Sequence, residues 1–423
     1  MARMAARVVT PPSGELLPKF VASLAPDWID AALAATGTAA IRRRRLPAEQ
    51  VVWLVIGMCL FRDLSMRELV ATLDLALPGP RGVRVAPSSI VQARERLGDE
   101  PLRWLFERTA STWAHASARA HAWRGLAVYG VDGTTVRIPD SVENRAHFGG
   151  QDTRWESTSG YPLARMVTLM ALRSHLLAGA QFGPYDTGER AYAEQLWPLL
   201  PDHSLAIVDR GFFSARTLLG ITRSGARREW LTRARSDLAS RRVKRLAAGD
   251  ELIELNVSSE ARRQDKTLPE TWQMRAIRYR RRGFKPQLLL TSLLDPKPYP
   301  AAEIIALYHE RWELELGYNE VKRTMLRREE STRSKSPRGV AQELWGLGIA
   351  YNLIRYEAER VAHEAGVPPT RISFVAALNF IESALRTWGT DSAGRLPERL
   401  LRLREDLSHF VLPERRDRTY PRA

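Results

Sequence analysis

The sequence predicts an α/β fold, with a strand-rich core preceded and followed by helical segments. Residues 1 to about 125 carry apolar residues at helical spacing. From 126 onward the pattern changes to apolar runs of strand length bounded by Gly, Pro and Asp. Helical spacing returns beyond about residue 300. These changes predict a helical N-terminal domain (1–125), a mixed domain (126–330) and a helical C-terminal region (331–423).

The N-terminal region is predicted to be a small helical, DNA-binding module. Its apolar spacing predicts helices over 47–62, 65–74, 88–97 and 100–116. The helix at 88–97 carries side chains that can contact base edges and phosphates from a groove, namely Ser88, Ser89, Gln92, Arg94 and Arg96. A run of arginines precedes the first of these helices and either grips phosphates or is a solvated charge cluster: Arg42, Arg43, Arg44 and Arg45.

The sequence pattern of the middle region predicts a sheet with a helix between its third and fourth strands. The strands are the apolar runs at 126–140, 163–173, 175–186 and 204–213, and the helix is the amphipathic stretch 188–200. An arginine-rich segment with short strands follows at about 227–282 and looks inserted. A buried strand at 286–294 then resumes the core and leads into one long helix, from about 301 to 328. Two further helices, around 339–362 and 370–387, and a short basic tail end the chain.

The composition indicates a folded protein with a polyanionic partner. The 423 residues include 64 Lys and Arg against 48 Asp and Glu, a net charge of +16, and 44% are hydrophobic. That hydrophobic content excludes a disordered or collagen-like chain, and nucleic acid is the commonest polyanion for a basic cytoplasmic protein. The alternative is a codon effect, because only seven of the 64 cations are lysine and arginine codons are GC-rich.

The sequence predicts no disulfide, zinc site, export signal or membrane span. The single cysteine, Cys59, cannot form an internal disulfide, and with eight scattered histidines it offers no zinc-ligand cluster. The first residues lack the long apolar stretch of a secretion signal. The most apolar window, 51–60, is too short to cross a bilayer. We therefore expect a cytoplasmic, nucleoid-associated protein.

Two aspartates follow apolar strands. Asp132 ends the run AVYGVD, Asp209 ends the run SLAIVD, and each precedes a glycine within two residues. Carboxylates at strand ends lie at the rim of a sheet, where two of them can reach one hard cation if the strands are adjacent. Taken singly, each aspartate is more often a turn residue. Arg210, directly after Asp209, is counted among the candidate DNA contacts.

The long helix carries a polar stripe. At about 100° per residue, one face presents Tyr308, Arg311, Glu315, Asn319 and Lys322. The plain alternative is a solvated face with an Arg311–Glu315 pair. Apolar residues flank the stripe closely, which favours the wall of a cleft.

Three carboxylates, Asp132, Asp209 and Glu315, fit two-metal-ion chemistry at phosphorus. Two Mg²⁺ ions need carboxylate oxygens to hold them, and they activate water or a 3′ hydroxyl while stabilising the departing oxygen. Cations on the helix of Glu315, with Arg333 and Lys335 beyond it, would then grip phosphates next to the scissile bond. A serine hydrolase is not supported, because no G-x-S-x-G occurs.

These residues resemble those of a known family. The spacing Y-x2-R-x3-E-x6-K, formed by Tyr308, Arg311, Glu315 and Lys322, resembles the signature of the bacterial insertion-sequence-four family of DDE transposases. Three further segments resemble the blocks around the family's first two aspartates and the segment after its catalytic helix: 131–149, 206–214 and 333–355. The stretch from about 20 to 115 resembles the N-terminal domain of one branch of the family. The resemblance covers most of the chain.

The resemblance implies a fold and a metal site. The fold is a ribonuclease-H-like core of three strands, a helix and a fourth strand, with a mostly β insertion at about 227–282 before the last strand. The implied ligands of two Mg²⁺ ions, for which Mn²⁺ can substitute, are Asp132, Asp209 and Glu315.

The resemblance also implies an activity. The chain would be an endonuclease that cuts an insertion sequence, a transposable element, at its terminal inverted repeats and joins it to target DNA through a hairpin intermediate. Tyr308, Arg311 and Lys322 would contact the transposon end and the hairpin. Two protomers would act together in a synaptic complex.

Two alternatives remain open from the sequence, and one position departs from the family pattern. The chain could be a non-catalytic DNA-binding relative acting through its helical module, or a metal-dependent nuclease without strand transfer. Gln287 stands where some family members have a tryptophan that stacks on a flipped base. Either another aromatic such as Phe284 or Trp272 replaces it, or the hairpin step runs differently.

Overall fold

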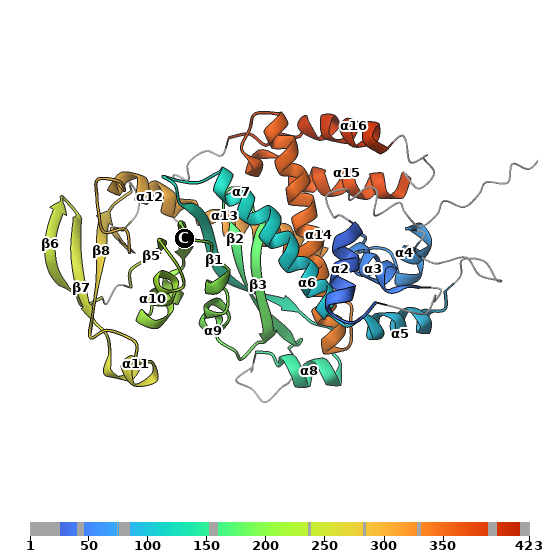
Figure 1. The fold of residues 1–423 in the computed structure, drawn as a ribbon, viewed down its shortest axis with the longest axis horizontal. Coiled ribbons are helices and arrows are strands. Elements are labelled where there is room, and N and C mark those ends of the chain that lie inside the picture. Colours follow the sequence, from blue (N-terminus) through green and yellow to red (C-terminus); the bar gives the residue numbers. More distant parts are fainter. Residues whose placement is uncertain are drawn as a thin grey trace, which may run out of the picture.

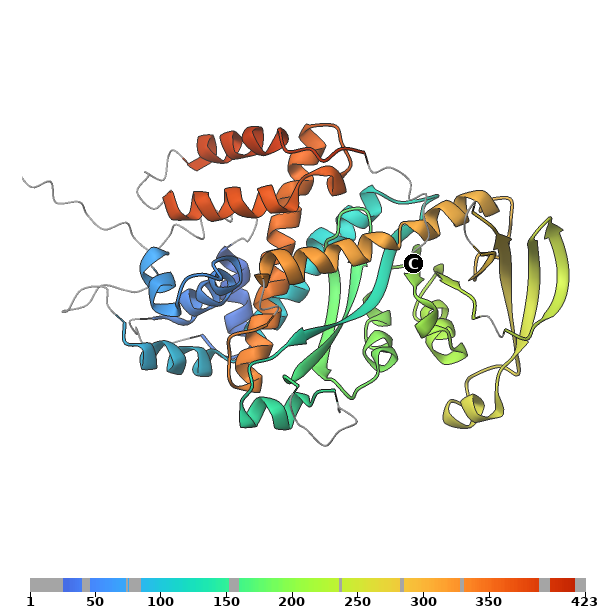
Figure 2. The same ribbon diagram turned by 180° about the vertical axis from the view of Figure 1, so that it is seen from behind.

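The protein combines one large mixed β-sheet with helices on both of its faces and at one end (Figures 1 and 2). The computed structural model describes residues 26–39, 46–73, 75, 85–151, 160–235, 238–281, 285–327, 331–387 and 396–414. The α/β class expected from the sequence is therefore confirmed.

The first part of the chain is helical, as its apolar spacing predicts. Its helices are α2 (Pro26–Ala35), α3 (Ala48–Leu60), α4 (Met66–Thr72), α5 (Pro87–Leu97), α6 (Glu100–Thr109), the π-helical turn η1 (Ala110–Ala114) and α7 (His115–Ala120). Helix α4 begins with a capping box, in which the Ser65 hydroxyl accepts from the Glu68 amide and the Glu68 carboxylate accepts from the Ser65 amide. Helix α3 is buried from Val51 to Leu60, which accounts for the high apolar content of this window.

Five strands form the half of the sheet that follows. They are β1 (Ala127–Arg137), β2 (Leu163–Ala171), β3 (Leu177–Pro184), β4 (Ser204–Val208) and β5 (Arg228–Arg233). Their order is β3-β2-β1-β4-β5. The first three pair antiparallel, β4 runs parallel to β1, and β5 runs parallel to β4. Helix α8 (Val142–Phe148) follows β1, while α9 (Glu189–Glu194) and η2 (Trp197–Leu199) lie between β3 and β4. The turn η3 (Arg210–Phe212) and α10 (Ala215–Arg223) lie between β4 and β5.

Four more strands extend the same sheet beyond β5. In spatial order they are β9 (Gln287–Thr291), β8 (Thr271–Tyr279), β7 (Asp250–Asn256) and β6 (Arg241–Ala247), all paired antiparallel, and the short helix α11 (Ser259–Gln264) follows β7. The segment 227–282, expected to be an insertion, therefore begins with a strand of the core. The arginines at both ends of β5 hid its centre, where Trp230 and Leu231 are fully buried.

The two faces of β1 pack against different helices. Gly130 faces α13 (Trp312–Asn319), since a Cβ added there would lie 2.7 Å from Leu314. Tyr129 faces the opposite side, where its hydroxyl lies 2.8 Å from His115 Nδ1 at the start of α7. Figure 2 shows α13 crossing one face of the sheet, and Figure 1 shows α7 and α9 on the other. The missing side chain at Gly130 allows the helix to approach β1 closely.

The long helix expected over 301–328 is broken into three pieces. They are α12 (Ala301–His309), α13 and the π-helical turn η4 (Glu320–Met325), with a turn at Glu310 and Arg311 between the first two. The expectation of one regular helix was wrong, and so was the uniform 100° per residue used to draw its polar stripe.

The remaining helices belong to the C-terminal part of the chain. They are α14 (Pro337–Glu364), the turn η6 (Pro369–Arg371), α15 (Phe374–Thr387) and α16 (Leu396–Ser408), of which the last was not expected. Helix α14 runs between the sheet and helices α2 to α5 (Figure 1) and packs on α3 and α6. One continuous cluster of buried apolar side chains extends through these helices and the sheet. Within the described ranges, none of the helices is both long and apolar enough to span a membrane.

Candidate active site

Asp132 and Asp209 lie side by side at the carboxyl ends of neighbouring parallel strands. The β1–β4 pairing ends at Val131 opposite Val208, so the two aspartates occupy the next position of each chain. Only the parallel pairing of β1 ends before Asp132. The expectation that Asp132 ends its strand was wrong, because β1 continues to Arg137 in antiparallel pairing with β2. Strand β4 ends at Val208, so Asp209 lies just beyond it, directly before the turn η3, and a rim forms at this point of the sheet.

Glu315 reaches this rim from α13. The helix is held on the sheet by Tyr318, whose buried hydroxyl donates to the backbone oxygen of Asp132 and lies 2.8 Å from Thr168 Oγ1 in β2. Gly317 lies so close to β2 that an added Cβ would sit 2.5 Å from Met170 Cε. These contacts connect the helix that carries Glu315 directly to the backbone of the first aspartate.

Arg311 stands among the three carboxylates. Its guanidinium lies 3.2 Å from Glu315 Oε1 and 3.8 Å from Asp132 Oδ2. Burial lowers the pKa of Arg311, but nearby Tyr308, Asp209, Asp132 and Glu315 outweigh burial and raise it. The arginine therefore supplies positive charge at the point where the carboxylates converge.

The carboxyl group of Asp132 is destabilised in its charged form. Burial raises its pKa to about 6, and the negative charges of Asp209 and Glu189 act in the same direction. A hydrogen bond of 2.8 Å from the Gly133 amide to Oδ1 and the charge of Arg311 oppose the rise in pKa. Uncompensated negative charge at a partly buried rim favours binding of a cation.

The arrangement is not a closed metal cage. Among the residues that the structure describes, no three His, Cys, Asp or Glu side chains are close enough together to hold an ion as they stand. The chemistry of the donors nevertheless suits a hard cation, because three carboxylates surround one guanidinium.

Two further residues at the rim were missed by sequence reasoning. Arg233 ends β5, the next parallel strand, and its charge lowers the pKa of Tyr308, which is raised by burial. Glu189, the first residue of α9, lies against Gly133 and accepts from Arg165 at 3.0 Å. The sequence did carry a sign of Arg233, because it lies at the end of a short strand-forming run, as Asp132 and Asp209 do.

The polar stripe is only partly preserved. Tyr308 is buried beside Arg311, and with Glu315 they lie at the rim. Asn319 is exposed at the last position of α13, and Lys322 is half-buried in the π-helical turn η4. The wider turn moves Lys322 away from the angle that a regular helix would give it.

The other predicted DNA contacts lie in different settings. Arg210 is exposed in η3 next to Asp209, and Lys335 is exposed two residues before α14. Arg333 instead donates to the backbone oxygens of Leu64, Phe61 and Met58, at 2.7, 2.9 and 3.3 Å. The guanidinium of Arg333 thus joins the end of α3 to the segment before α14. The run Arg42, Arg43, Arg44 and Arg45 lies outside the described residues.

The helix expected to read bases, α5, presents only some of its polar residues. Ser88, Ser89, Gln92 and Arg96 are exposed. Arg94 is buried, and its guanidinium donates to Gln342 Oε1 at 3.1 Å and to Ser334 Oγ at 3.0 Å. Its position three residues before Leu97 and four after Ile90, both buried, is the signal that marks it as an inward-facing residue.

Trp272, one of the aromatic residues named as a possible replacement for the missing tryptophan, lies on β8, the strand next to that of Gln287. That ring is buried and packs 5.4 Å from Trp230 and 5.8 Å from Phe213. Gln287 accepts a hydrogen bond of 3.0 Å from the Tyr279 hydroxyl on the neighbouring strand. Phe284 lies outside the described residues.

We expect Tyr318→Phe to destabilise the protein by about 1–3 kcal/mol, because it leaves the Asp132 carbonyl and Thr168 hydroxyl buried without their partner. Chemical denaturation measures the change. Tyr192→Phe is the matched control, since it removes a single hydroxyl bond of 3.1 Å to Pro184. An equal or larger loss in the control would contradict the special role of Tyr318.

We expect Arg333→Met to lower the free energy of unfolding by roughly 2–3 kcal/mol, because three carbonyl oxygens lose a charged donor. Lys335→Met, two residues later at an exposed position, should change stability by less than about 0.5 kcal/mol. Thermal or urea denaturation of the pair separates the two roles. Equal stabilities would show that Arg333 is not a structural anchor.

Comparison with known proteins gives consistent matches. Residues 15–107 match the family described as "Insertion element 4 transposase N-terminal", and residues 123–353 match "Transposase DDE domain". The chain is 40% identical over 402 residues to "Transposase InsG for insertion sequence element IS4" of Escherichia coli (strain K12), covering 95% of this chain and 90% of that protein. It is 33% identical over 237 residues to "Putative transposase InsZ" of the same organism, covering 56% and 77%.

Among solved structures, the chain is similar to one described as a piggyBac transposase synaptic complex with hairpin DNA. The TM-score is 0.42 and the identity 12%, over 99% of this chain and 88% of that chain. This likeness is too low to support any conclusion about the present protein.

Proposed function

This chain belongs to the insertion element 4 family of DDE transposases, and from that premise we propose that it cuts DNA at the ends of an insertion sequence and joins the freed ends to target DNA. The observation that carries the proposal is the convergence of Asp132, Asp209 and Glu315 on Arg311 at the rim of the sheet. Phosphoryl transfer needs such a concentration of carboxylates when metal ions assist it.

We infer a ribonuclease-H-like core in strands β1 to β5. Support comes from their order, β3-β2-β1-β4-β5, with three antiparallel strands followed by two that run parallel to β1. On this interpretation the β insertion is β6 to β9, so it begins after β5 and includes β9, the strand that was expected from the sequence to resume the core. Residues 1–125 are then a DNA-binding domain and 331–423 a helical C-terminal region. The pairing of β9 with β5 then makes the insertion a continuation of the catalytic sheet.

We propose that Asp132, Asp209 and Glu315 hold two divalent metal ions, Mg²⁺ or in its place Mn²⁺. When bound, the ions would polarise the attacking and leaving oxygens at phosphorus. The carboxylates fit this role because Asp132 is held in a state that favours protonation or a cation, and because Arg311 already supplies positive charge between Asp132 and Glu315. Glu189 lies close enough for its negative charge to raise the pKa of Asp132.

The cations at the rim are suited to the DNA backbone. Arg311 can exchange its carboxylate partners for a phosphate oxygen, since guanidinium binds both groups in the same fork geometry. Arg210 is exposed one residue from Asp209, and Arg233 ends the adjacent strand. Tyr308 and Lys322 complete the proposed contacts with the transposon end.

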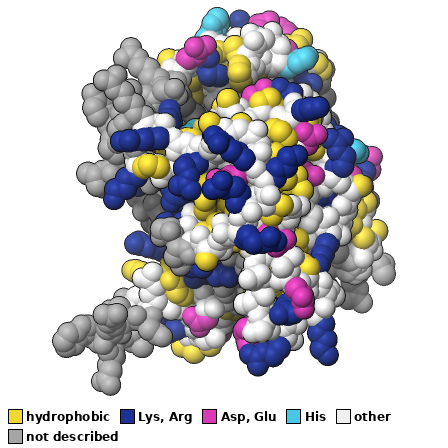
Figure 3. All heavy atoms as spheres, turned by 90° about the vertical axis from the view of Figure 1, so that its left-hand side faces the viewer, with side chains coloured by type: hydrophobic (Ala, Val, Ile, Leu, Met, Phe, Trp, Pro, Cys, Tyr) yellow, Lys and Arg dark blue, Asp and Glu magenta, His cyan; other side chains and the backbone are white. Residues whose placement is uncertain are grey.

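A second basic surface lies at the far edge of the sheet. Figure 3 shows Lys and Arg side chains gathered on the face that carries the outer strands. Strand β6 contributes exposed Arg241, Arg242, Lys244 and Arg245. A duplex held at the rim could extend across this surface, and the bound length of DNA would then exceed the cleavage site. Phosphate contacts of this kind make binding weaken steeply as salt concentration rises.

The assembly and the hairpin step are parts of the same proposal. Two protomers are needed to bring two DNA ends together in a synaptic complex. If excision uses a hairpin, Tyr279 is the aromatic residue placed beside Gln287 in the adjacent strand, and its ring stacks edge-on with His309 at 5.8 Å. A Tyr279→Ala variant that forms hairpins normally would exclude this residue from base stacking.

The test is a cleavage and joining assay with DNA that carries the element's own terminal inverted repeats. We expect cleavage that requires Mg²⁺ or Mn²⁺ and joining of the 3′ ends to a target plasmid. Cleavage without joining would favour a nuclease, and tight binding without cleavage would favour a non-catalytic DNA-binding relative. DNA with scrambled ends is the control for end recognition.

A further inference from the structure

The side of α13 that faces away from the sheet rim is held by a buried set of ionisable side chains, which we call the buried anchor. It consists of His175, Glu313, Glu320, Tyr351 and Arg355. The His175 side chain is fully buried, that of Arg355 is 2% exposed, and the Tyr351 side chain is buried in α14. These residues come from the β2–β3 turn, the segment α13–η4 and helix α14. The catalytic proposal uses none of them.

The contacts within the buried anchor are short and reciprocal. His175 Nε2 lies 2.8 Å from Glu313 Oε2, and His175 Nδ1 lies 3.3 Å from Glu320 Oε2. The second carboxylate, Glu320, also accepts from Tyr351 Oη at 2.8 Å, from Arg355 Nε at 2.9 Å and from Arg355 Nη2. His175 Nδ1 also accepts from Arg355 Nη2 at 3.0 Å. The imidazole is therefore connected to two carboxylates of the same helical segment, to Glu313 directly and to Glu320 together with Arg355.

The two carboxylates near His175 lie on either side of Glu315 in the sequence. Glu313 is two residues before it, about 200° around the helix, so the two side chains point to opposite sides. Glu320 is the first residue of the π-helical turn η4. Anchors before and after Glu315 fix both the rotation of α13 about its axis and the point where the wider turn begins.

The backbone at His175 is also unusual. Its φ angle is 65°, in the left-handed region that a non-glycine residue adopts only against a steric cost. Its amide donates to the Ala171 oxygen at 2.8 Å, which closes the β2–β3 turn. Left-handed residues that persist under such constraint often serve a functional site. Here the conformation directs the imidazole toward the back of α13.

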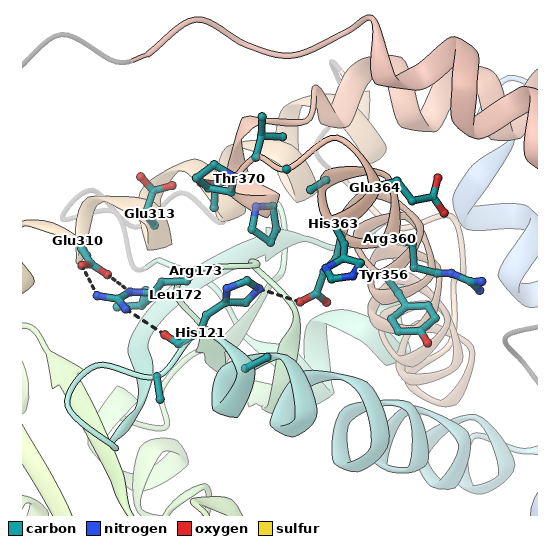
Figure 4. Close-up of a pocket in the computed structure, with 18 residues that line it drawn as sticks. His121, Leu172, Arg173, Glu310, Glu313, Tyr356, Arg360, His363, Glu364 and Thr370 are labelled. Carbon is teal, nitrogen blue, oxygen red and sulfur yellow. Dashed lines mark hydrogen bonds and ion pairs between the residues drawn. The ribbon is translucent and has the colours of Figure 1, made fainter.

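An open cavity of about 1150 Å³ borders the same part of the molecule. Figure 4 shows Glu310 and Glu313 on one side of it and residues of α14 on the other. A second histidine–glutamate pair lies in this cavity, where His121 Nε2 is 3.2 Å from Glu359 Oε1. That pair connects the end of α7 to α14 and does not touch α13, which makes it a matched control.

We propose that His175 is a positioning residue for the metal centre: by contacting Glu313 directly and Glu320 together with Arg355, it holds α13 in the rotation that presents Glu315 and Arg311 to Asp132 and Asp209. This inference rests on the proposed function, because it assumes that the three carboxylates form a metal centre. Its test measures Mn²⁺ binding and does not require that the protein cleaves DNA. Removal of the imidazole leaves the three carboxylates in the chain and loosens the orientation of α13, the helix that carries Glu315.

The test compares Mn²⁺ binding, DNA-end binding and cleavage in His175→Ala, Glu313→Ala and Glu313→Gln. We expect both alanine variants to bind Mn²⁺, followed by electron paramagnetic resonance, about 10-fold more weakly and to cleave about 10–100-fold more slowly, as for loss of a residue that orients a metal ligand. Affinity for end DNA should stay within about twofold. Glu313→Gln keeps an oxygen that accepts from His175 and should retain near-parental binding and rate.

The control variants His121→Ala and Glu359→Gln should bind Mn²⁺ and cleave as the parent does. The proposal is overturned if His175→Ala binds Mn²⁺ with parental affinity, whatever its stability, or if the control pair produces the same loss. The proposed function fails separately if the parent binds Mn²⁺ but cleaves no end DNA, and in that case the binding data still decide the role of His175. A parent that binds no Mn²⁺ contradicts both.

Discussion

Asp132→Asn is expected to abolish end cleavage and, in the absence of divalent metal, to stabilise the protein. Cleavage should fall by at least about 10³-fold, or roughly 4 kcal/mol in the barrier, because a proposed metal ligand loses its charge. The same change removes a carboxylate whose charged form is disfavoured by burial and by Asp209. Asparagine retains an oxygen that accepts from the Gly133 amide. A gain in stability together with a loss of activity is typical of substitutions at functional sites.

The pH dependence gives the sign of the stability effect. Asp132 has a pKa of about 6 in the folded protein, above its ordinary value of 3.8. Between pH 4 and pH 6 the folded state therefore binds more protons than the unfolded state, and the free energy of unfolding falls as pH rises through this window. We expect Asp132→Asn to exceed the parent by about 1–3 kcal/mol at pH 7.5 in EDTA and to match it near pH 3. Urea denaturation at both pH values measures the difference.

Asp209→Asn and Glu315→Gln are the companion variants. Both should lose cleavage to the same extent as Asp132→Asn, and Asp209→Asn should lower the pKa of Asp132 because one repelling charge is gone. At one fixed Mg²⁺ concentration, the parent should be stabilised more than any of the three variants. Parental cleavage by any of them would remove that residue from the proposed centre.

Arg311→Gln is expected to destabilise the protein, whereas Asp132→Asn stabilises it, and to reduce cleavage less than Asp132→Asn does. Without metal, loss of the guanidinium leaves Asp132, Asp209 and Glu315 to repel one another, so the free energy of unfolding should fall by about 2 kcal/mol. Mg²⁺ should restore this loss and should stabilise the variant more than it stabilises the parent, because a competing cation is gone. Melting temperature against Mg²⁺ concentration measures both effects.

Cleavage by Arg311→Gln should fall by on the order of 10²-fold at saturating Mg²⁺, since a donor to the phosphate is lost. The acidic limb of the pH–rate profile should also move to higher pH, because the charge of Arg311 lowers the pKa of Asp132 in the parent. Arg311→Lys keeps the charge without the fork and should give intermediate values. An unchanged Mg²⁺ stabilisation in Arg311→Gln would contradict the placement of the guanidinium among the carboxylates.

Sequence reasoning predicted the parts of the site that depend on strand ends and on local spacing. Asp132 and Asp209 follow apolar runs that proved to be neighbouring parallel strands. Tyr308, Arg311 and Glu315 lie within eight residues, and the single turn at Glu310 and Arg311 does not separate them. It also predicted the α/β class, because periodicity reports which side of each element is buried.

The parts that it missed depend on tertiary contacts or on departures from regular geometry. The break at Arg311 and the π-helical turn leave no pattern of apolar residues, so Lys322 was placed by an angle that does not apply. Arg333 and Arg94 look like exposed cations in the sequence, but their guanidinium groups satisfy buried oxygen acceptors. Such partners are distant in sequence, and arginine at the edge of an apolar face is the one local sign of them.

The most direct test of the central claim is a Mn²⁺ titration followed by electron paramagnetic resonance, with the parent and with Asp132→Asn, Asp209→Asn and Glu315→Gln. If the three carboxylates form one metal centre, the parent binds Mn²⁺ and each single substitution weakens that binding by at least about 10-fold, or roughly 1.4 kcal/mol. Parental affinity and stoichiometry in any one of the three variants would contradict the claim.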